Sequence, residues 1–326
     1  MLSSGITYLY CKKTSKQSAG NSLYESESVK GAVSNDYSVY RMNSYEYIRP
    51  VIAIEKKEEA DSLLGLKSKI VNYIKEKKKA GTLISASVYL RVFHKGEWIS
   101  VNDTETYYPG SLIKVAGLLT YLRMEELHPG TLDKRLSFES QKEIIPNQTY
   151  NSKQLEFGKS YTVRELLKYM IAYSDNNATY LLNKNVDMNL FLKLYSDLNL
   201  TPLDLKHKDV KMNIRDYSTF FKVIYNSTYL SLDHSEFAAE LLSQCDFKEG
   251  MLKGLPKGTK IAHKFGEMGD PTSRQLHEAG IIYLKNTQYL LTVMTKGYDI
   301  TKMPGVISDI TQMTYDDLSK NTSIVE

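Results

Sequence analysis

The chain has 326 residues, of which 42% are hydrophobic and 25% are charged, and a formal net charge of +4. This composition is typical of a globular protein with a large core and excludes a fibrous or wholly disordered chain. The lysines are scattered or lie in helix-like runs such as 75–79, so a nucleic-acid-binding surface is not expected. Cys11 and Cys245 lie far apart, and the histidines show no metal-binding spacing. We therefore expect no disulfide, no metal and no organic cofactor.

Residues 1–55 predict an N-terminal extension or linker, because 12–50 are rich in Ser, Lys, Asn and Tyr without a sustained period. Residues 5–11 are apolar but too short for a bilayer span or a signal-peptide core. They fit disordered extension better than the end of a membrane anchor that starts outside this chain. Residues 56–326 are predicted to form one domain.

Apolar spacing predicts a helix over residues 58–79. Residues 82–93 alternate in the manner of a strand, and the turn at Lys95-Gly96 leads into a second strand at 97–101. The middle of the chain carries helical periods over 111–122, 162–172, 176–184, 187–198, 211–226 and 233–243. Three strand-like runs and a last helix follow, at 259–264, 279–284, 289–295 and 304–318.

Strands at both ends of the chain with helices between them predict an α/β protein of the α+β type. We expect one antiparallel five-stranded sheet covered by helices. The middle of the chain is expected to add an all-helical subdomain. The sequence has no internal repeat and no glycine-rich phosphate loop.

Ser111 is the first candidate for chemistry. It follows a Pro109-Gly110 turn and begins an apolar helical run, and Lys114 lies one turn later on the same face. This arrangement suits a nucleophile beside an amine base, with the free N–H groups of the helix start available to an oxyanion. Ser-x-x-Lys is a short pattern that also occurs by chance. A lysine on the buried face of a helix, however, needs a functional or structural reason.

Two further motifs follow. Ser174-Asp175-Asn176 joins two apolar helices, and such a run is most often a helix cap. Lys264-Phe265-Gly266 ends a strand, where a glycine allows another backbone or a ligand to approach closely. Each motif alone has an ordinary structural explanation.

Together, in this order and on a helix, a loop and a strand, the three motifs resemble those of the penicillin-recognising serine enzymes, and among them the class A β-lactamases. The resemblance covers roughly residues 60–320 and implies a β-lactamase/transpeptidase-like fold. For the site it implies that Ser111 is the nucleophile and Lys114 the base. It also implies that Ser174 donates a proton to the leaving nitrogen, that Asn176 is the substrate-binding amide and that Lys264 is the cation that attracts the substrate carboxylate. It also implies an oxyanion hole from the backbone N–H groups of Ser111 and Glu267, the residue after Gly266. For Asp175 we expect a structural role in its loop.

Lys114 can act as a base only when its amine is neutral. A free lysine with a pKa of ~10.4 is neutral about once in a few thousand molecules at pH 7. Burial and the positive charge of Lys264 would both lower the pKa of Lys114.

The sequence departs from the family pattern at the third motif. Phe265 stands where the family usually has Thr or Ser, so the hydroxyl that would bind the substrate carboxylate is absent. Ser273, Arg274 or His277 could replace it, and arginine is the natural bidentate partner of a carboxylate. A surface position for Arg274 in a polar loop is an equally good interpretation.

The second departure concerns deacylation. The sequence has no Glu-x-x-Leu-Asn stretch, whose Glu drives water onto the acyl-enzyme in class A β-lactamases. The nearest match begins at Asp209, which makes Asp209 the candidate deacylation base. The alternative, which we favour, is that residues 212–217 open the next helix and Asp209 is only a charge near its start. The acylation residues are therefore complete, whereas the deacylation residues are not.

The sequence thus predicts a serine hydrolase that forms an acyl-enzyme with β-lactams. The alternatives are a penicillin-binding D-Ala-D-Ala peptidase or a β-lactam sensor that deacylates slowly, and a silent cell-wall-binding scaffold whose site Phe265 has closed. The expected partner is a β-lactam or a D-Ala-terminated peptide, and no nucleic acid. We expect a monomer. The resemblance implies an extracytoplasmic location, although the chain shows no clear signal peptide.

Overall fold

The computed structural model describes residues 36–42, 45–139, 149–150, 152–203, 210–270 and 272–322. Its centre is an antiparallel five-stranded sheet in the order β4-β3-β11-β10-β9. The strands are β3 (Ser85–Val92), β4 (Glu97–Val101), β9 (Lys260–Asp270), β10 (Ser273–Tyr283) and β11 (Gln288–Gly297). The predicted fold class, an α+β protein with one five-stranded sheet, is confirmed.

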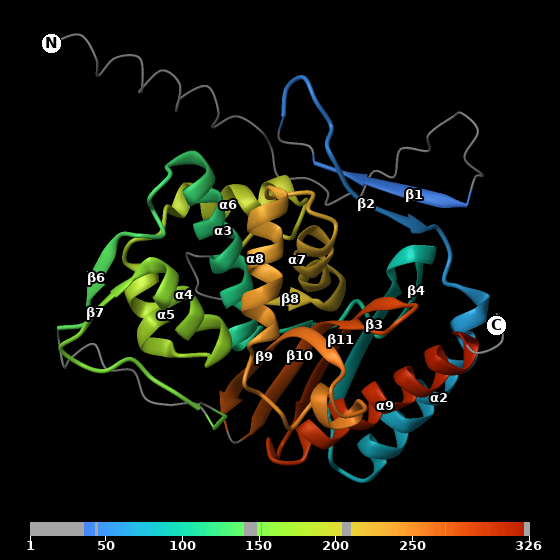
Figure 1. The fold of residues 1–326 in the computed structure, drawn as a ribbon. Helices are drawn as coiled ribbons and strands as arrows, with labels where there is room; N and C mark the ends of the chain where they lie inside the picture. Colours follow the sequence, from blue (N-terminus) through green and yellow to red (C-terminus); the bar gives the residue numbers. More distant parts are fainter. Residues whose placement is uncertain are drawn as a thin grey trace, which may run out of the picture.

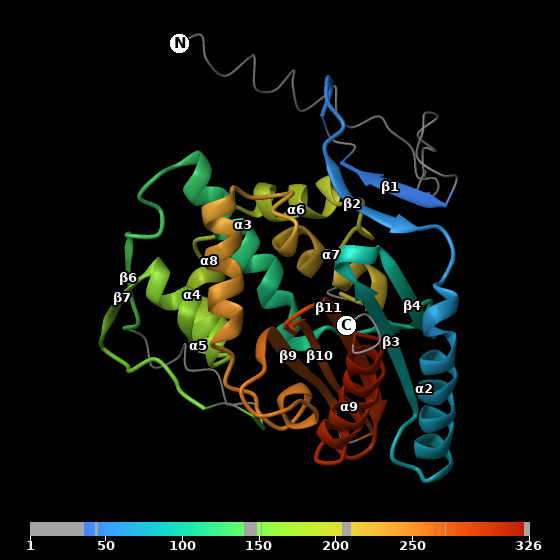
Figure 2. The same ribbon diagram turned by 45° about the vertical axis from the view of Figure 1, so that its right-hand side comes forward.

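Helices cover both faces of this sheet (Figure 1). On one face α2 (Asp61–Lys79) and α9 (Met303–Thr322) lie side by side, as Figure 2 shows. On the other face lie the six helices of the middle of the chain, α3 (Lys114–Leu127), α4 (Val163–Ala172), α5 (Asn176–Asn183), α6 (Met188–Asp197), α7 (Ile214–Tyr225) and α8 (Leu232–Ser243). Each face has its own cluster of buried apolar side chains.

Short polar residues fix the starts of several helices. The Thr162 side chain accepts the Glu165 N–H, and the Glu165 carboxylate accepts the Thr162 N–H, so a capping box starts α4. Asn213 caps α7 in a similar way. Short strands and 3-10 turns complete the fold, β5 (Thr106–Tyr107), β6 (Arg135–Ser137), β7 (Ser160–Thr162), β8 (Met212–Asn213), η1 (Phe93–Lys95), η2 (Gly110–Ile113) and η4 (Met251–Gly254).

The last strands are longer than the sequence predicted. β9 continues beyond Lys264 to Asp270, and β10 starts at Ser273, six residues before the predicted start. The ladder pairs Tyr283 with Lys260 at one end and Ser273 with Asp270 at the other. The added residues are mostly polar or glycine, so apolar alternation does not reveal them, and backbone hydrogen bonds hold the extension.

Within the part of the chain where an extension or linker was expected, β1 (Tyr37–Arg41) and β2 (Val51–Lys56) form a two-stranded sheet. Figure 1 shows it above the five-stranded sheet, beside α7. A two-stranded sheet alone is marginally stable. This one is held by Glu55, which is fully buried.

The Glu55 carboxylate meets three cations and one hydroxyl of the domain. It forms ion pairs with Arg91 of β3, with Lys222 of α7 at 3.2 Å and with Arg215 at 3.6 Å, and it accepts the Tyr89 hydroxyl at 2.9 Å. Burial alone would raise the pKa of Glu55, but the charges of Lys222, Arg91 and Arg215 outweigh burial and lower the pKa to about 2.

We expect Glu55→Gln to lower the free energy of unfolding at pH 7 by about 3–5 kcal/mol, because it leaves buried cations without their counter-charge. The pKa of Glu55 is about 2 in the folded protein and about 4.5 in the unfolded chain. Its stabilisation is therefore complete above pH 4.5 and lost as the pH falls towards 2. Urea unfolding at pH 7 and pH 3 measures both effects. Glu46→Gln, at an exposed position between β1 and β2, is the control, and equal losses in the two variants would contradict the prediction.

Candidate functional site

Ser111 and Lys114 lie where η2 meets α3. Ser111 is in the 3-10 turn, Lys114 is the first residue of the α-helix, and the Lys114 backbone N–H donates to the Ser111 carbonyl. Both side chains are buried, with 3% and 4% of their surface exposed. The structure thus places the Ser-x-x-Lys motif at the start of a buried helix.

The Ser174 hydroxyl connects the three motifs. Its Oγ accepts a hydrogen bond from Lys114 Nζ at 3.3 Å and another from Lys264 Nζ at 2.9 Å. Lys114 Nζ also donates to the Ser174 carbonyl at 2.7 Å and to Asn176 Oδ1 at 2.9 Å. The motifs, which lie up to 150 residues apart in sequence, therefore meet at one buried hydroxyl.

Ser174 itself has an unusual backbone conformation. Its φ is 55°, in the left-handed region that residues with a side chain rarely adopt. Strain of this kind persists only when the surroundings fix it, and it is frequent at functional sites. Here the conformation lets the carbonyl and the hydroxyl of one residue both accept from Lys114.

The pKa values of both lysines are lowered, in each case mainly by burial. Burial, and after it the charge of Lys264, hold the pKa of Lys114 well below its usual value, while Asp175 and Glu267 act weakly in the opposite direction. Burial lowers the pKa of Lys264 to about 8, against the opposing effects of Cys245, Glu278 and Glu267. Burial and the nearby charge of Lys264 thus shift Lys114 towards the neutral amine, which is the form that a base requires.

Strand β9 and turn η2 meet backbone to backbone. A Cβ atom at Gly266 would lie 2.5 Å from the Pro109 carbonyl oxygen and 2.6 Å from the Leu112 nitrogen, so only glycine fits. Gly110 has a φ of 54°, and a Cβ there would collide with the Glu267 carbonyl. The chain at Ser111 is thereby brought against the chain at Glu267.

Strand β10 anchors the segment that leads into η2, which the sequence analysis missed. Gln275 Oε1 accepts the Tyr108 N–H at 3.0 Å, and His277 Nε2 donates to the Tyr108 carbonyl at 3.0 Å. His277 Nδ1 accepts the Thr295 N–H at 3.1 Å, and burial lowers the pKa of His277 to about 4, so the ring is neutral. The sequence signal for this contact was the alternation of the polar residues Gln275 and His277 along one face of an otherwise apolar strand.

These contacts bear on the three residues that could replace the hydroxyl absent at Phe265, which are Ser273, Arg274 and His277. Both His277 ring nitrogens are bonded to backbone, so His277 is not available to a substrate carboxylate. Arg274 is half-buried near the hairpin between β9 and β10, where its guanidinium lies 3.5 Å from the Gly269 carbonyl. The structure does not bring Arg274 into the cluster around Ser174. Ser273 lies at the same hairpin.

Phe265 belongs to the core between the sheet and α2 and α9. Its ring stacks on Phe247 with centroids 4.5 Å apart and meets Tyr150 edge-on at 6.4 Å. Lys264 Nζ lies 4.2 Å from the centre of the ring and donates to the Phe265 carbonyl at 2.9 Å. Phe265 thus supports the Lys264 amine through its ring and its backbone.

The remaining expectations concern Asp175 and Asp209. The Asp175 carboxylate accepts the N–H groups of Leu155 and Asn177, both at 2.7 Å, and caps α5, in line with a structural role. Asp209 lies outside the described residues. Asn213, four residues later, caps α7, so this part of the stretch opens a helix, as the alternative interpretation had it.

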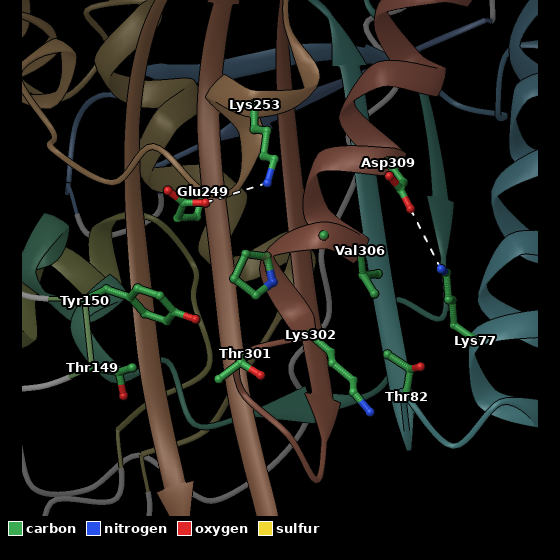
Figure 3. Close-up of a pocket in the computed structure, with 12 residues that line it drawn as sticks. Lys77, Thr82, Thr149, Tyr150, Glu249, Lys253, Thr301, Lys302, Val306 and Asp309 are labelled. Atoms are coloured by element: carbon green, nitrogen blue, oxygen red, sulfur yellow. Dashed lines mark ion pairs between the residues drawn. The ribbon is translucent and has the colours of Figure 1, made fainter.

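A cavity of about 690 Å³ lies between the start of α9 and the end of α2, and none of the candidate site residues lines it (Figure 3). Tyr150 joins the two regions, because its N–H lies 3.4 Å from Glu267 Oε1 and its hydroxyl donates to the Ile300 carbonyl at 3.3 Å. Figure 3 shows two ion pairs in its wall, Lys253–Glu249 at 3.8 Å and Lys77–Asp309 at 3.9 Å. Such exposed pairs contribute little stability.

Two further properties of the described residues bear on function. No helix among them combines the length and the apolar character that a membrane span requires. No group of three or more His, Cys, Asp or Glu side chains in the same part of the chain is placed to hold a metal ion.

Comparison with known proteins agrees with the geometry. A family model described as "Beta-lactamase enzyme family" matches residues 65–318. The structure of PBP-A is similar with a TM-score of 0.66 and 22% identity, covering 79% of this chain and 97% of that chain. The extended-spectrum β-lactamase TLA-1 gives a TM-score of 0.68 and 20% identity, covering 79% and 99%. A mutant of PBP-A, solved as an acyl-enzyme complex with penicillin G, is 21% identical with a TM-score of 0.66 and the same coverage as PBP-A. No curated protein sequence matches.

We expect Glu267→Gln to lower the pKa of both Lys114 and Lys264, because the variant removes a negative charge that favours their charged forms. NMR titration of labelled lysine side chains measures the two values. Glu249→Gln removes the same charge beside the exposed Lys253 and serves as the control. An unchanged pKa of Lys264 in Glu267→Gln, or an equal shift in the control, would count against this electrostatic account.

Proposed function

This chain belongs to the β-lactamase enzyme family, and from that premise we propose that it is a serine hydrolase that forms an acyl-enzyme with β-lactams. The observation that carries the proposal is the Ser174 hydroxyl shared by Lys114 and Lys264. This arrangement supports a base kept neutral by burial and by a second cation, next to a hydroxyl that can relay a proton.

In the proposed reaction Ser111 Oγ attacks the lactam carbonyl carbon. Lys114 takes the Ser111 proton, and the Oγ–C bond forms as the lactam C–N bond breaks. Ser174, 3.3 Å from Lys114 Nζ, passes a proton to the leaving nitrogen and is replenished from Lys114. Water then hydrolyses the ester in a separate step.

The other residues position the substrate. The backbone N–H groups of Ser111 and Glu267 form the oxyanion hole in this proposal, supported by the close contact of η2 with β9 at Gly266. Asn176 holds Lys114 and binds the substrate's amide carbonyl. Lys264 attracts the substrate carboxylate, and we propose that Arg274 at the β9–β10 hairpin provides a second contact.

A second candidate is a penicillin-binding D-Ala-D-Ala peptidase, or a β-lactam sensor that stays acylated. The absence of a Glu-x-x-Leu-Asn stretch from the sequence favours it, because that glutamate activates the deacylating water in class A β-lactamases. Acylation and hydrolysis are separate steps, so a chain can perform the first and stall at the second. Both candidates act on β-lactams or cell-wall peptides, and we propose an extracytoplasmic, monomeric protein.

We expect intact-protein mass spectrometry to show an adduct of the wild type with benzylpenicillin, and none with Ser111→Ala. Ser68→Ala, which alters an exposed serine of α2, should behave as the wild type. An adduct that decays over minutes indicates a β-lactamase, and one that persists for hours indicates the peptidase or sensor. An adduct on Ser111→Ala would place the nucleophile elsewhere.

We expect Gly110→Ala to slow acylation about 100-fold, because the new Cβ would displace the Glu267 backbone and with it one oxyanion donor. Gly130→Ala is the matched control. Gly130 also has a positive φ, 90°, but a Cβ there meets nothing within 4 Å. That variant should lose only about 1–2 kcal/mol of stability and retain its rate. Equal rates in the two variants would show that the contact of η2 with β9 does not matter for acylation.

A further inference from the structure

A second, smaller cavity lies against Lys114. Its volume is about 200 Å³, and Lys114, Gly117 and Tyr121 of α3 form part of its wall. These residues are three and four positions apart and therefore share one face of the helix. The rim includes Asn183 of α5 and Met188 of α6, which are both exposed. The cavity thus reaches from the surface at α5 and α6 to the amine-bearing residue of the site.

The hydroxyl groups and the amine in the wall already have protein partners, whereas the Asn183 amide lies at the exposed rim. The Tyr121 hydroxyl donates to the Leu182 carbonyl at 2.6 Å, and the Thr179 hydroxyl donates to the Asp175 carbonyl at 2.7 Å. Lys114 Nζ donates to Ser174 and Asn176. A charged or strongly polar ligand would therefore lose its hydration without gaining equivalent partners.

Size and lining favour an aromatic or branched aliphatic ligand. A dry apolar cavity of about 150 Å³ is large enough to bind benzene. Met170, Met188 and Phe191 line this cavity, and methionine adapts its shape to varied apolar ligands. The absent side chain of Gly117 provides part of the space, since a Cβ there would lie 3.8 Å from Met170 Cε, an ordinary contact.

We propose that this cavity binds a small uncharged apolar molecule, of about the size of toluene and separate from the substrate, and that its occupation alters the reactivity of Lys114. The exposed rim belongs to α5 and α6, and Ile113, the last residue of η2, also lines the cavity, whereas Ser111 is not among the lining residues. A ligand in contact with Lys114 excludes water from its surroundings and so disfavours the charged amine. Occupation and acylation are then linked, and each changes the other.

Toluene is the probe, and the methyl signals of Met170 and Met188 in methionine-labelled full-length protein are the readout. We expect both signals to shift saturably with one dissociation constant. Gly117→Leu fills the cavity and should abolish the shifts, while Gly65→Leu, at an exposed helical glycine of α2, should retain them. If Gly117→Leu does not fold, Gly117→Ala should weaken binding. Wild-type signals that do not respond, or shifts that persist in the filled variant, would overturn the proposal.

The effect on Lys114 rests on the proposed function and is tested separately. We expect saturating toluene to change the rate of acylation by benzylpenicillin about fivefold or more. Equal acylation rates with and without toluene would overturn the coupling. Displacement of toluene by the acyl group would overturn the claim that the ligand binds separately from the substrate. If benzylpenicillin neither labels the protein nor is hydrolysed by it, the proposed function fails, whereas the toluene titration still decides whether the cavity is a site.

Discussion

Two amines that share one buried hydroxyl constrain the whole structure. Lys114 and Lys264 both donate to Ser174 Oγ, and both are almost wholly removed from water. Two full positive charges so close together in a buried site repel strongly, so at least one amine is favoured in its neutral form. The two lysines do not hold this part of the structure together by their own attraction. Other interactions must therefore keep the helix start, the loop and the strand in contact.

Those forces come from close backbone packing and from the two cores. Gly110 and Gly266 let η2 and β9 approach so closely that any side chain at either position would collide with the opposite backbone. Gln275 fixes the segment just before η2 by accepting the Tyr108 N–H, and Asp175 ties its loop to Leu155. Apolar clusters on both faces of the sheet make it a rigid support.

The candidate residues Ser111 and Lys114 could be proposed from the sequence because they form a local pattern. A turn, an apolar helix and a lysine one turn later make up this pattern, and the expected position of both residues at a helix start agrees with the structure. The five-stranded sheet followed in the same way from apolar periods. The anchoring of Tyr108 by Gln275 did not, because it joins residues 167 apart and leaves no local pattern. The same reason hides the β1–β2 sheet, because the buried Glu55 carboxylate and the apolar contacts that join it to α7 link residues far apart in sequence.

That carboxylate has a consequence for where the autonomous folding unit begins. The family likeness starts at residue 65, whereas the counter-ion of Arg91 and Lys222 is supplied ten residues earlier, by Glu55. A chain trimmed to the family-matched residues would retain every candidate site residue, and yet Arg91 and Lys222 would have lost their anion. In this protein the residues that match the family do not include the anion that neutralises the buried cations. That anion lies on β2, so the β1–β2 sheet must be added to the family-matched residues to give a chain whose buried charges are paired.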